Sequence, residues 1–449
     1  SFVTGGHHSS PSMGNPNENK KQKKARIQGY VTFKEGKAFG DWIVKKKIDE
    51  GGFGKVYLMY NIKDPSQLAA LKAEPNEVSG GSAIKLEIKV IRELNAKGDT
   101  PHIPQVWHAA KHHKYCYMIM TLLGENFKTL RKKNETGDKN VWAILSVSSW
   151  IRLGVQSLYG LKILHDNGYL HRDIKPSNFA LGLATDPNRA TMVHLLDFGL
   201  ARSFAFKNSN GKWIRRLARC SVGFRGTSRY CSPNVHDKLE SGRRDDIWSL
   251  FYVLIELHCG LPWQKENDKL AIERVKCNSK DEVVMQNMPR ELRSIIPELR
   301  RLDCYQRPDY LGIYNAMKAV MVRYNIQAYD LYDWEKKPNA PRALRPPKAP
   351  EWYAPESYFA SDPLGIICAP SILSAPSSTS RSTIPTSNSR IGSDEKTTTI
   401  NDADVFKGMT QTRETQTRDE DEKKDDKDKY KKDKDKKEEK DEDKKEDPL

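Results

Sequence analysis

The chain has 449 residues, of which 37% are hydrophobic and 30% are charged, and its formal net charge is +16. This low apolar share predicts that part of the chain lies outside a folded region of roughly 300 residues. The seven cysteines are scattered without a CxxC pair, which argues against a disulfide scaffold or cysteine metal cluster and favours a reducing compartment. The longest apolar run, residues 247–257, is too short to span a bilayer, so no membrane span is expected.

Residues 1–35 are predicted to form a disordered, basic N-terminal arm. The arm is rich in Gly, Ser, Asn and Lys, and residues 20–24 read KKQKK. A solvated tail is the simplest interpretation, and a nuclear-import signal or a patch for an acidic partner is the alternative. We therefore expect a cytoplasmic protein, with a nuclear location as the alternative.

Two strands joined by glycines follow the arm. Residues 42–48 and 56–60 alternate as strands do, and the turn between them carries three glycines. Glycine has no Cβ, so backbone N–H groups in such a hairpin can approach phosphates closely. The predicted nucleotide contacts here are Ile48, Gly51, Gly52, Phe53, Gly54 and Val56. Asp49 stands where a further glycine is expected, and its charge would weaken nucleotide binding unless the side chain points outward.

The third strand, residues 68–72, ends at Lys72, which could hold the α- and β-phosphates if a carboxylate orients it. An amphipathic helix follows, with Ser82 as its predicted N-cap and Gly98 as its predicted end. Glu87 lies between the apolar positions of this helix and is the predicted partner of Lys72. The alternative interpretation is an ordinary surface glutamate.

Two further strands at residues 106–107 and 115–121 lead into a connector. An adenine edge would meet backbone groups of this connector near Thr121 and Leu123. Ala70 and Met120, on the adjoining strands, complete the predicted nucleotide site.

A helical pattern over residues 148–166 leads to the most specific stretch of the chain. His171-Arg172-Asp173 is followed by Asn178 five residues after the aspartate, and then by Asp197-Phe198-Gly199. This order and spacing is typical of a protein-kinase catalytic loop followed by a metal-binding turn.

The rest of the chain divides into a helical part and a tail. A basic segment ends at GTSRYCSPN (residues 226–234), a strongly apolar helix opens at Asp245, and helices to about residue 325 complete a lobe. Residues 337–449 become rich in Pro, then in Ser and Thr. The last 32 residues hold 13 basic and 16 acidic side chains. We expect residues 337–449 to be disordered, because they have few apolar side chains to bury.

The motifs HRDIKPSNFA, LLDFGLAR, FRGTSRY, RRDDIWSLFYVLIEL and LPW resemble those of the casein kinase 1 superfamily. Trp248, the RPDY at residues 307–310 and the DWEK at residues 333–336 are most similar to its tau-tubulin kinase branch. The resemblance covers residues 36–336 and implies an α+β, bilobal protein-kinase fold. The β-rich N-lobe would span about residues 36–122 and the helical C-lobe about residues 124–336. Ser232-Pro233-Asn234 agrees with the superfamily, whereas Asp49 does not.

The resemblance also implies roles for single residues in ATP-dependent phosphorylation of Ser/Thr by a monomeric enzyme. Asp173 would orient the substrate hydroxyl, and Lys175 would offset charge on the γ-phosphate. Asn178 and Asp197 would hold Mg²⁺, which prefers oxygen ligands. Lys72, oriented by Glu87, would position ATP. Asp246 would brace the catalytic loop.

The basic surface predicts the substrate class. In the superfamily an anion pocket favours acidic or phosphorylated protein substrates, and Arg229 and Arg274 match or fall near its positions. The alternative is that these arginines are solvated or pair locally. Arg172 could also pair with a phosphate on the activation segment. No nucleic-acid partner is expected, because no platform of aromatic and basic residues is evident. A catalytically weak kinase-fold scaffold remains the alternative function, favoured only by Asp49.

Overall fold

The computed structural model describes residues 31–51, 54–76, 82–134, 144–337, 342–343, 352 and 354–366. Gly52 and Phe53, which were predicted to contact the nucleotide, lie outside these described residues, as do residues 1–30 and most of the tail.

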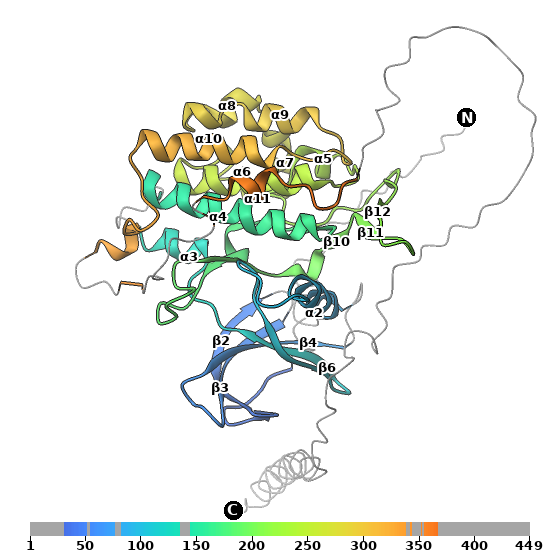
Figure 1. Cartoon of the computed structure of the whole chain (residues 1–449), viewed down its shortest axis with the longest axis vertical. Coiled ribbons are helices and arrows are strands. Elements are labelled where there is room, and N and C mark those ends of the chain that lie inside the picture. The colour runs from blue at the N-terminus through green and yellow to red at the C-terminus, as the bar shows by residue number, and fades with distance from the viewer. Residues whose placement is uncertain are drawn as a thin grey trace, which may run out of the picture. The chain divides into compact units, whose positions relative to one another are not determined.

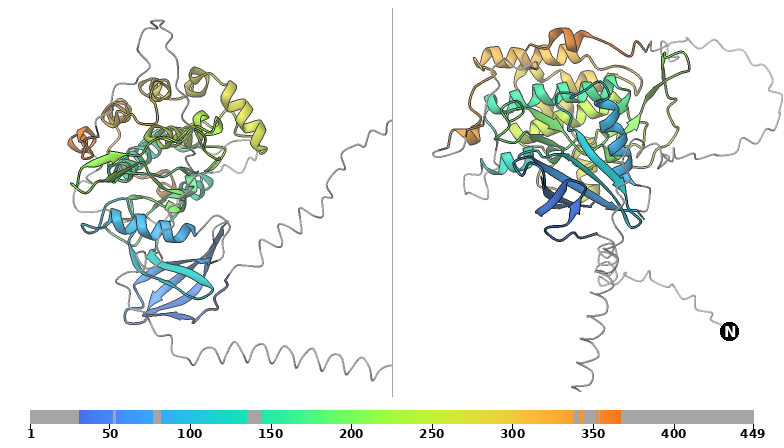
Figure 2. Two further views of the ribbon diagram at one scale, coloured as in Figure 1. Left: turned by 90° about the vertical axis from the view of Figure 1, so that its right-hand side faces the viewer. Right: turned by 60° about the horizontal axis from the view of Figure 1, so that its bottom comes forward.

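A six-stranded antiparallel sheet forms the N-lobe, in the order β1-β2-β3-β4-β6-β5 (Figures 1 and 2). The strands are β1 (Ala38–Phe39), β2 (Trp42–Gly51), β3 (Gly54–Asn61), β4 (Leu68–Pro75), β5 (Val106–Lys111) and β6 (Tyr115–Thr121). One helix, α2 (Ala83–Leu94), connects β4 to β5 and contacts β5, β6 and the turn after the DFG aspartate. The sheet thereby brings the predicted hairpin, Lys72 and connector into one lobe.

The two faces of this sheet have different roles, because successive side chains of a strand point to opposite sides. Tyr57, Met59 and Leu71 are buried in a core with aromatic residues from β1 and β6. Their neighbours in sequence point to the other face, and the register pairs Val56 with Lys72 and Ala70 with Met120. Four predicted site residues therefore share the face that is not used for the N-lobe core.

Helix α2 is capped by a residue that is distant in sequence. Ser82 was predicted to cap it, but its side chain makes no cap bond and its hydroxyl instead lies 3.2 Å from Glu74. The buried Glu74 carboxylate accepts a hydrogen bond from the backbone N–H of Ile84 at 2.8 Å, satisfying a free donor of the first turn. A negative charge at this end also interacts favourably with the helix dipole. This contact fixes α2 against β4, the strand that carries Lys72.

The C-lobe is helical, and α4 (Val147–Asp166) and α6 (Arg243–His258) lie at its centre, where most of their residues are buried. Gly154 lets them approach, since a Cβ there would lie 3.2 Å from a methyl group of Leu254. The surrounding helices are α3 (Phe127–Lys132), α5 (Pro233–His236), α7 (Lys269–Asn278), α8 (Asp281–Met285), α9 (Ile295–Arg301), α10 (Tyr310–Arg323) and α11 (Glu356–Ala360).

Short strands and single 3-10 turns complete the C-lobe, and some of them carry the catalytic motifs. The strands pair as β7 (Tyr169–Leu170) with β10 (Arg202–Ser203), β8 (Phe179–Leu181) with β9 (Val193–Leu195), and β11 (Ala205–Lys207) with β12 (Trp213–Arg215). The 3-10 turns are η1 (Pro176–Asn178), η2 (Phe198–Leu200), η3 (Arg290–Leu292) and η4 (Asp333–Glu335). The predicted two-lobed α+β fold is confirmed.

The folded region extends beyond residues 36–336 on both sides. Phe33 is 6% exposed and packs edge-on against Phe39, with ring centroids 4.9 Å apart. Beyond residue 336, Trp352 and Phe359 are buried, and α11 lies against α10. Ordered residues therefore lie on both sides of the predicted boundaries at 36 and 336, which stay predictions. Proline-rich composition concealed the few aromatic residues that anchor the second extension.

Among the described residues, no helix is both long enough and apolar enough to cross a membrane.

Candidate active site

Three charged side chains from three elements meet between the lobes. The Lys72 ammonium on β4 lies 2.6 Å from Glu87 Oε2 on α2 and 3.3 Å from Asp197 Oδ1 at the start of η2. Glu87 is 2% exposed, so it is not the ordinary surface glutamate of the alternative interpretation. The predicted partner of Lys72 is therefore confirmed as its ion-pair partner.

Backbone geometry sets the Asp197 carboxylate in place. Asp197 has φ = +66°, in the left-handed region that non-glycine residues seldom occupy. The next residue, Phe198, is fully buried in the C-lobe core and packs beside the His171 ring, with centroids 5.5 Å apart. The buried phenylalanine thus anchors the turn, and Asp197 is held toward Lys72.

Burial and opposite charge compete within this cluster. Burial acts to lower the pKa of Lys72, but the carboxylates of Asp197 and Glu87 outweigh it and raise the pKa above its usual value. Burial acts to raise the pKa of Asp197, but the charges of Lys72, Lys175 and His171 hold it below its usual range. Lys72 is therefore cationic and Asp197 anionic near neutral pH.

The catalytic loop arranges Asp173 with two donors. Lys175 Nζ lies 2.5 Å from Asp173 Oδ2, and the Thr227 hydroxyl donates to Asp173 Oδ1 at 2.7 Å. Asn178 Nδ2 donates to the backbone oxygen of Asp173 at 2.9 Å. Asp173 is 5% exposed. The carboxylate is thus held in one orientation at the edge of the site.

Asp246 on α6 braces this loop from below. Its buried carboxylate accepts hydrogen bonds from the backbone N–H groups of His171 at 2.7 Å and Arg172 at 2.8 Å. His165 Nε2 lies 3.0 Å from the same carboxylate. Burial lowers the pKa of His165, so its ring is neutral and its single N–H donates to Asp246. Burial acts to raise the pKa of Asp246, but the hydrogen bonds and favourable electrostatic interactions from His165 and His171 together outweigh burial and lower that pKa overall.

The predicted nucleotide contacts lie around the face of the sheet that carries Lys72. Ala70 is 8% and Met120 7% exposed, whereas Ile48 is 42% exposed at the edge. Gly51 and Gly54 are paired across the hairpin. A side chain at Gly54 is excluded, because a Cβ would lie 2.1 Å from the backbone oxygen of Ala73.

The connector offers fewer free backbone groups than expected. The Thr121 N–H donates to the Gln105 oxygen at 3.0 Å, and the Thr121 hydroxyl accepts from the Gln105 N–H at 2.9 Å. Thr121 thus uses its N–H within the protein. Recognition of an adenine edge would therefore fall to the backbone of Leu123, which is partly buried in the connector.

The Asp49 side chain is exposed, although its register partner Val56 lies on the sheet face that carries Lys72. Its carboxylate accepts a hydrogen bond from the Glu50 N–H at 2.8 Å, and the register pairs it with Val56. The side chain is therefore solvated and locally bonded.

Asn178 and Asp197 offer oxygen ligands suited to a divalent cation. The Leu196 N–H donates to the Asn178 backbone oxygen at 2.9 Å, which brings these two segments together. Asn178 uses its amide nitrogen as a donor, so its amide oxygen is left to act, with the Asp197 carboxylate, as a ligand. This donor set fits a hard cation such as Mg²⁺.

Arg229 is engaged differently from the predicted anion-pocket role. Its guanidinium donates to the backbone oxygens of Trp263, Gln264 and Glu266 at 3.3, 2.8 and 2.6 Å. Those contacts correspond to the alternative of local pairing, because carbonyls occupy the donors that a phosphate would need. Arg274 is exposed on α7. An anion-binding role for either arginine stays a prediction.

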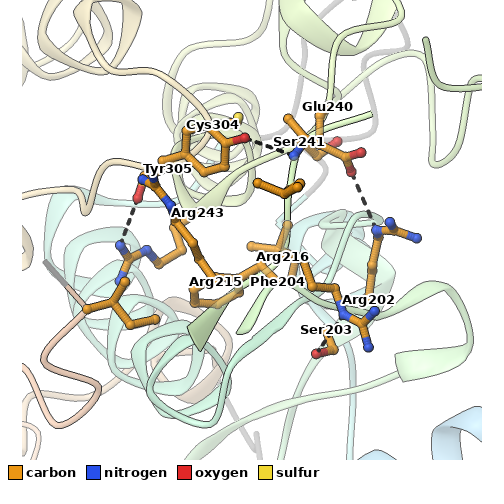
Figure 3. A pocket seen from close by; sticks show the side chains of 14 residues that line it. Arg202, Ser203, Phe204, Arg215, Arg216, Glu240, Ser241, Arg243, Cys304 and Tyr305 are labelled. Atoms are coloured by element: carbon orange, nitrogen blue, oxygen red, sulfur yellow. Dashed lines mark hydrogen bonds and ion pairs between the residues drawn. The ribbon is translucent and has the colours of Figure 1, made fainter. Parts of the chain in front are cut away.

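A second group of arginines escaped the sequence analysis except for Arg172. The Glu240 carboxylate accepts from Arg219 at 2.7 Å and lies 3.4 Å from Arg202, an ion pair drawn in Figure 3. Burial lowers the pKa of Arg172 to about 10, with further contributions from the charges of Arg202 and Arg219. The guanidinium groups of Arg202 and Arg219 therefore converge on one carboxylate. Arg172 feels their charges but donates to the Leu200 backbone oxygen at 2.8 Å. In the sequence, the density of arginines after residue 200 was the signal that could have pointed to this cluster.

Comparison with known proteins shows a shared family. The sequence model of the protein kinase domain matches residues 42–320. An inactive tau-tubulin kinase of Caenorhabditis elegans is 42% identical over 285 residues, which cover 63% of this chain and 96% of that protein. A candidate serine/threonine-protein kinase of the same organism is 37% identical over 298 residues, or 66% and 83% of the two chains. A candidate casein kinase I of Caenorhabditis elegans is 32% identical over 302 residues, which cover 66% of this chain and 83% of that protein.

Proposed function

The chain belongs to the protein kinase family, and on this premise we propose that it transfers the γ-phosphate of ATP to Ser or Thr hydroxyl groups of protein substrates. The ion-paired cluster of Lys72, Glu87 and Asp197 carries this proposal, because it joins both lobes in an arrangement that can hold a nucleotide. We further propose Mg²⁺ as the metal and a monomeric, cytoplasmic enzyme.

Each residue has one role in this mechanism. Lys72, held by Glu87, contacts the ATP phosphates. Asp173 accepts a hydrogen bond from the substrate hydroxyl and orients it toward the γ-phosphate, and Lys175 offsets the charge that develops there. Asn178 and Asp197 would hold Mg²⁺, which supplies charge neutralisation of the phosphate oxygens. Thr227 keeps the Asp173 carboxylate in place through its 2.7 Å hydrogen bond.

Substitutions of the charged cluster test the activity. Lys72→Met and Asp197→Asn should each reduce kcat by about 10²-fold or more, because each removes charge stabilisation at the transferred group. Incorporation of labelled phosphate into a protein substrate measures the loss. Lys63→Met is the matched control, since Lys63 pairs with Asp41 on the exposed surface. Thermal unfolding checks that all variants remain folded. Undiminished incorporation by both cluster variants would contradict the proposal.

The alternative is a kinase-fold scaffold without catalysis. The name of the inactive tau-tubulin kinase relative favours it, as does Asp49. Against it, every chemical position named above is filled in this chain. Autophosphorylation of the purified protein, compared with the Asp197→Asn variant, separates the two: equal and negligible incorporation by both would favour the scaffold.

We also propose that acidic or phosphorylated proteins are preferred substrates. The arginine cluster of Arg172, Arg202 and Arg219 supports this better than Arg229 does. Two of these cations, Arg202 and Arg219, pair with the one carboxylate of Glu240, and Arg219 binds it through two nitrogens at 2.7 and 3.1 Å. A phosphate carries more charge than a carboxylate and accepts the same forked hydrogen bonds, so it could replace Glu240 there.

Matched peptides test this preference. Arg202→Ala combined with Arg219→Ala should raise KM for a phosphoserine-containing peptide by about 10-fold, the loss expected for a charge-assisted hydrogen bond. The unphosphorylated peptide should be affected much less. Arg290→Ala, with a side chain 77% exposed, is the control. Equal changes for both peptides would count against phosphate recognition at this cluster.

A further inference from the structure

A segment beyond the kinase motifs lies across the C-lobe. Residues 354–366, here called the strap, contain α11 and continue toward the β11–β12 hairpin (Figure 1). The Tyr358 ring stacks on Tyr159 of α4 with centroids 4.2 Å apart. Phe359 is fully buried and stacks on Tyr314 of α10 at 5.0 Å. The strap is thus anchored on two helices of the lobe.

Polar contacts hold the strap at the end of α11. Arg307 donates to the backbone oxygens of Phe359 and Ser361 at 3.2 and 2.8 Å. Lys162 of α4, which has no exposed side-chain surface, lies 4.3 Å from the centroid of the Tyr358 ring. The same ammonium lies 3.3 Å from the Ser361 hydroxyl. Two basic side chains of the C-lobe therefore bind this segment.

From these contacts a continuous path leads to the catalytic loop. The Arg307 guanidinium lies 4.8 Å from the centroid of Tyr310, and the Tyr310 hydroxyl lies 2.6 Å from His165 Nδ1. His165 in turn bonds Asp246, which holds the backbone of the loop. Packed side chains thus link the strap to the segment that carries Asp173.

The other end of the strap reaches the activation segment. Leu364 is 5% exposed, and Ile366 lines a pocket together with Arg215, Leu217 and Tyr305 (Figure 3). Ile366 also borders a second hollow with Trp213 and Ile214 of β12. One short segment therefore touches the hairpin of the activation segment and the support of the catalytic loop.

We propose that the strap is a positioning element that holds the activation segment, and through Tyr310 and His165 the catalytic loop, in the arrangement described above. The effect on turnover rests on the proposed kinase function, whereas the ordering of the activation segment does not. Gly365 and Ile366 of the strap line a hollow together with Trp213 and Ile214, so the strap adds apolar contact to the β11–β12 hairpin.

A single substitution at Ile366, away from α11, tests this role without disturbing the anchors. Ile366 is partly exposed, so Ile366→Ser should leave the melting temperature near that of the full-length wild-type chain. Amide hydrogen exchange of residues 202–219 should become faster, and kcat should fall by about 3- to 10-fold, a range typical of coupling between packed elements, with little change in KM for ATP. Ile62→Ser is the matched control, because Ile62 is 57% exposed in the N-lobe.

Two truncations extend the test. In a chain ending after Ile366, the amide hydrogens of residues 202–219 should exchange at the wild-type rate. In a chain ending after Lys337, which lacks the strap, they should exchange faster. If the shorter chain fails to fold, the exchange measurement on the Ile366→Ser variant still tests the proposal. Unchanged exchange in Ile366→Ser, or equal loss in Ile62→Ser, would overturn the proposal. A wild-type chain that phosphorylates no substrate would refute the proposed function. The exchange rates would still test whether the strap orders the activation segment.

Discussion

Lys72 keeps its charge in a site where only 17% of its side chain is exposed, because two carboxylates lie within 3.3 Å. Removing a single member of such a buried cluster leaves the others uncompensated, which costs more than an exposed pair would. The sequence predicted both Lys72 and Glu87, since strand and helix patterns place them in the expected order. It could not predict that Asp197 would turn toward them, because this depends on a left-handed residue anchored by Phe198.

The charge at Asp49 gives a prediction at the scale of one residue. Asp49→Gly and Asp49→Asn should both lower KM for ATP by about 2- to 5-fold, because an exposed charge pair contributes at most ~1 kcal/mol. The effect should shrink at high salt, since solvent-exposed charges are screened. Steady-state ATP titration at two ionic strengths measures it. Asp64→Asn, an exposed acid between β3 and β4, is the control. An unchanged KM in both Asp49 variants would reject the idea.

Helix α6 shows how one element organises several others. Asp246 in its first turn holds the catalytic loop, and Asp245 holds the start of α5. Asp245 accepts hydrogen bonds from the Ser232 hydroxyl at 2.5 Å, the Asn234 amide at 2.9 Å and the Gly242 N–H at 2.7 Å. The SPN sequence, noted only as a family mark, thus has a structural role, because its Ser and Asn are donors for a buried carboxylate.

Removing Asp245 should destabilise the lobe. Asp245→Ala leaves three donors without their acceptor and should lower the free energy of unfolding by about 3 kcal/mol. Asp268→Ala, which removes the single cap bond of α7 at 2.8 Å, is the matched control and should cost about 1 kcal/mol. Urea denaturation measures both. Equal losses would show that the Asp245 contacts contribute no more than an exposed cap.

At the scale of the whole molecule, buried histidines make the fold sensitive to acid. His102 and His194 are 2% and 0% exposed, and His102 lies 2.7 Å from the backbone oxygen of Val193 in β9. Burial lowers the pKa of His102 to about 4 and that of His194 to about 3. Both are therefore neutral in the folded chain at pH values where an unfolded histidine is protonated.

This difference fixes the sign of the pH dependence. Between pH 6.5 and about 4 the unfolded chain binds more protons than the folded chain, so stability falls as the pH falls. Each histidine contributes up to about 1.4 kcal/mol per pH unit. His102→Asn should make stability fall less steeply with falling pH, because it removes one titratable group. Asn is chosen because it tolerates the φ of +64° found at this position. Chemical denaturation at several pH values measures the slope, and an unchanged slope would contradict this account.

The sequence by itself determined the two-lobed fold, the catalytic loop and the metal-binding turn, because these depend on local spacing and on side-chain periodicity. Only the tertiary structure decided which basic groups remain available for an anion. Arg229 is held by carbonyls 34 to 37 residues away, whereas Arg202 and Arg219 converge on Glu240. The strap was likewise invisible in a proline-rich stretch, since its few aromatic residues gain their meaning only from the helices they cover. Long-range contacts of this kind leave no local pattern, and they decide where a charge can act.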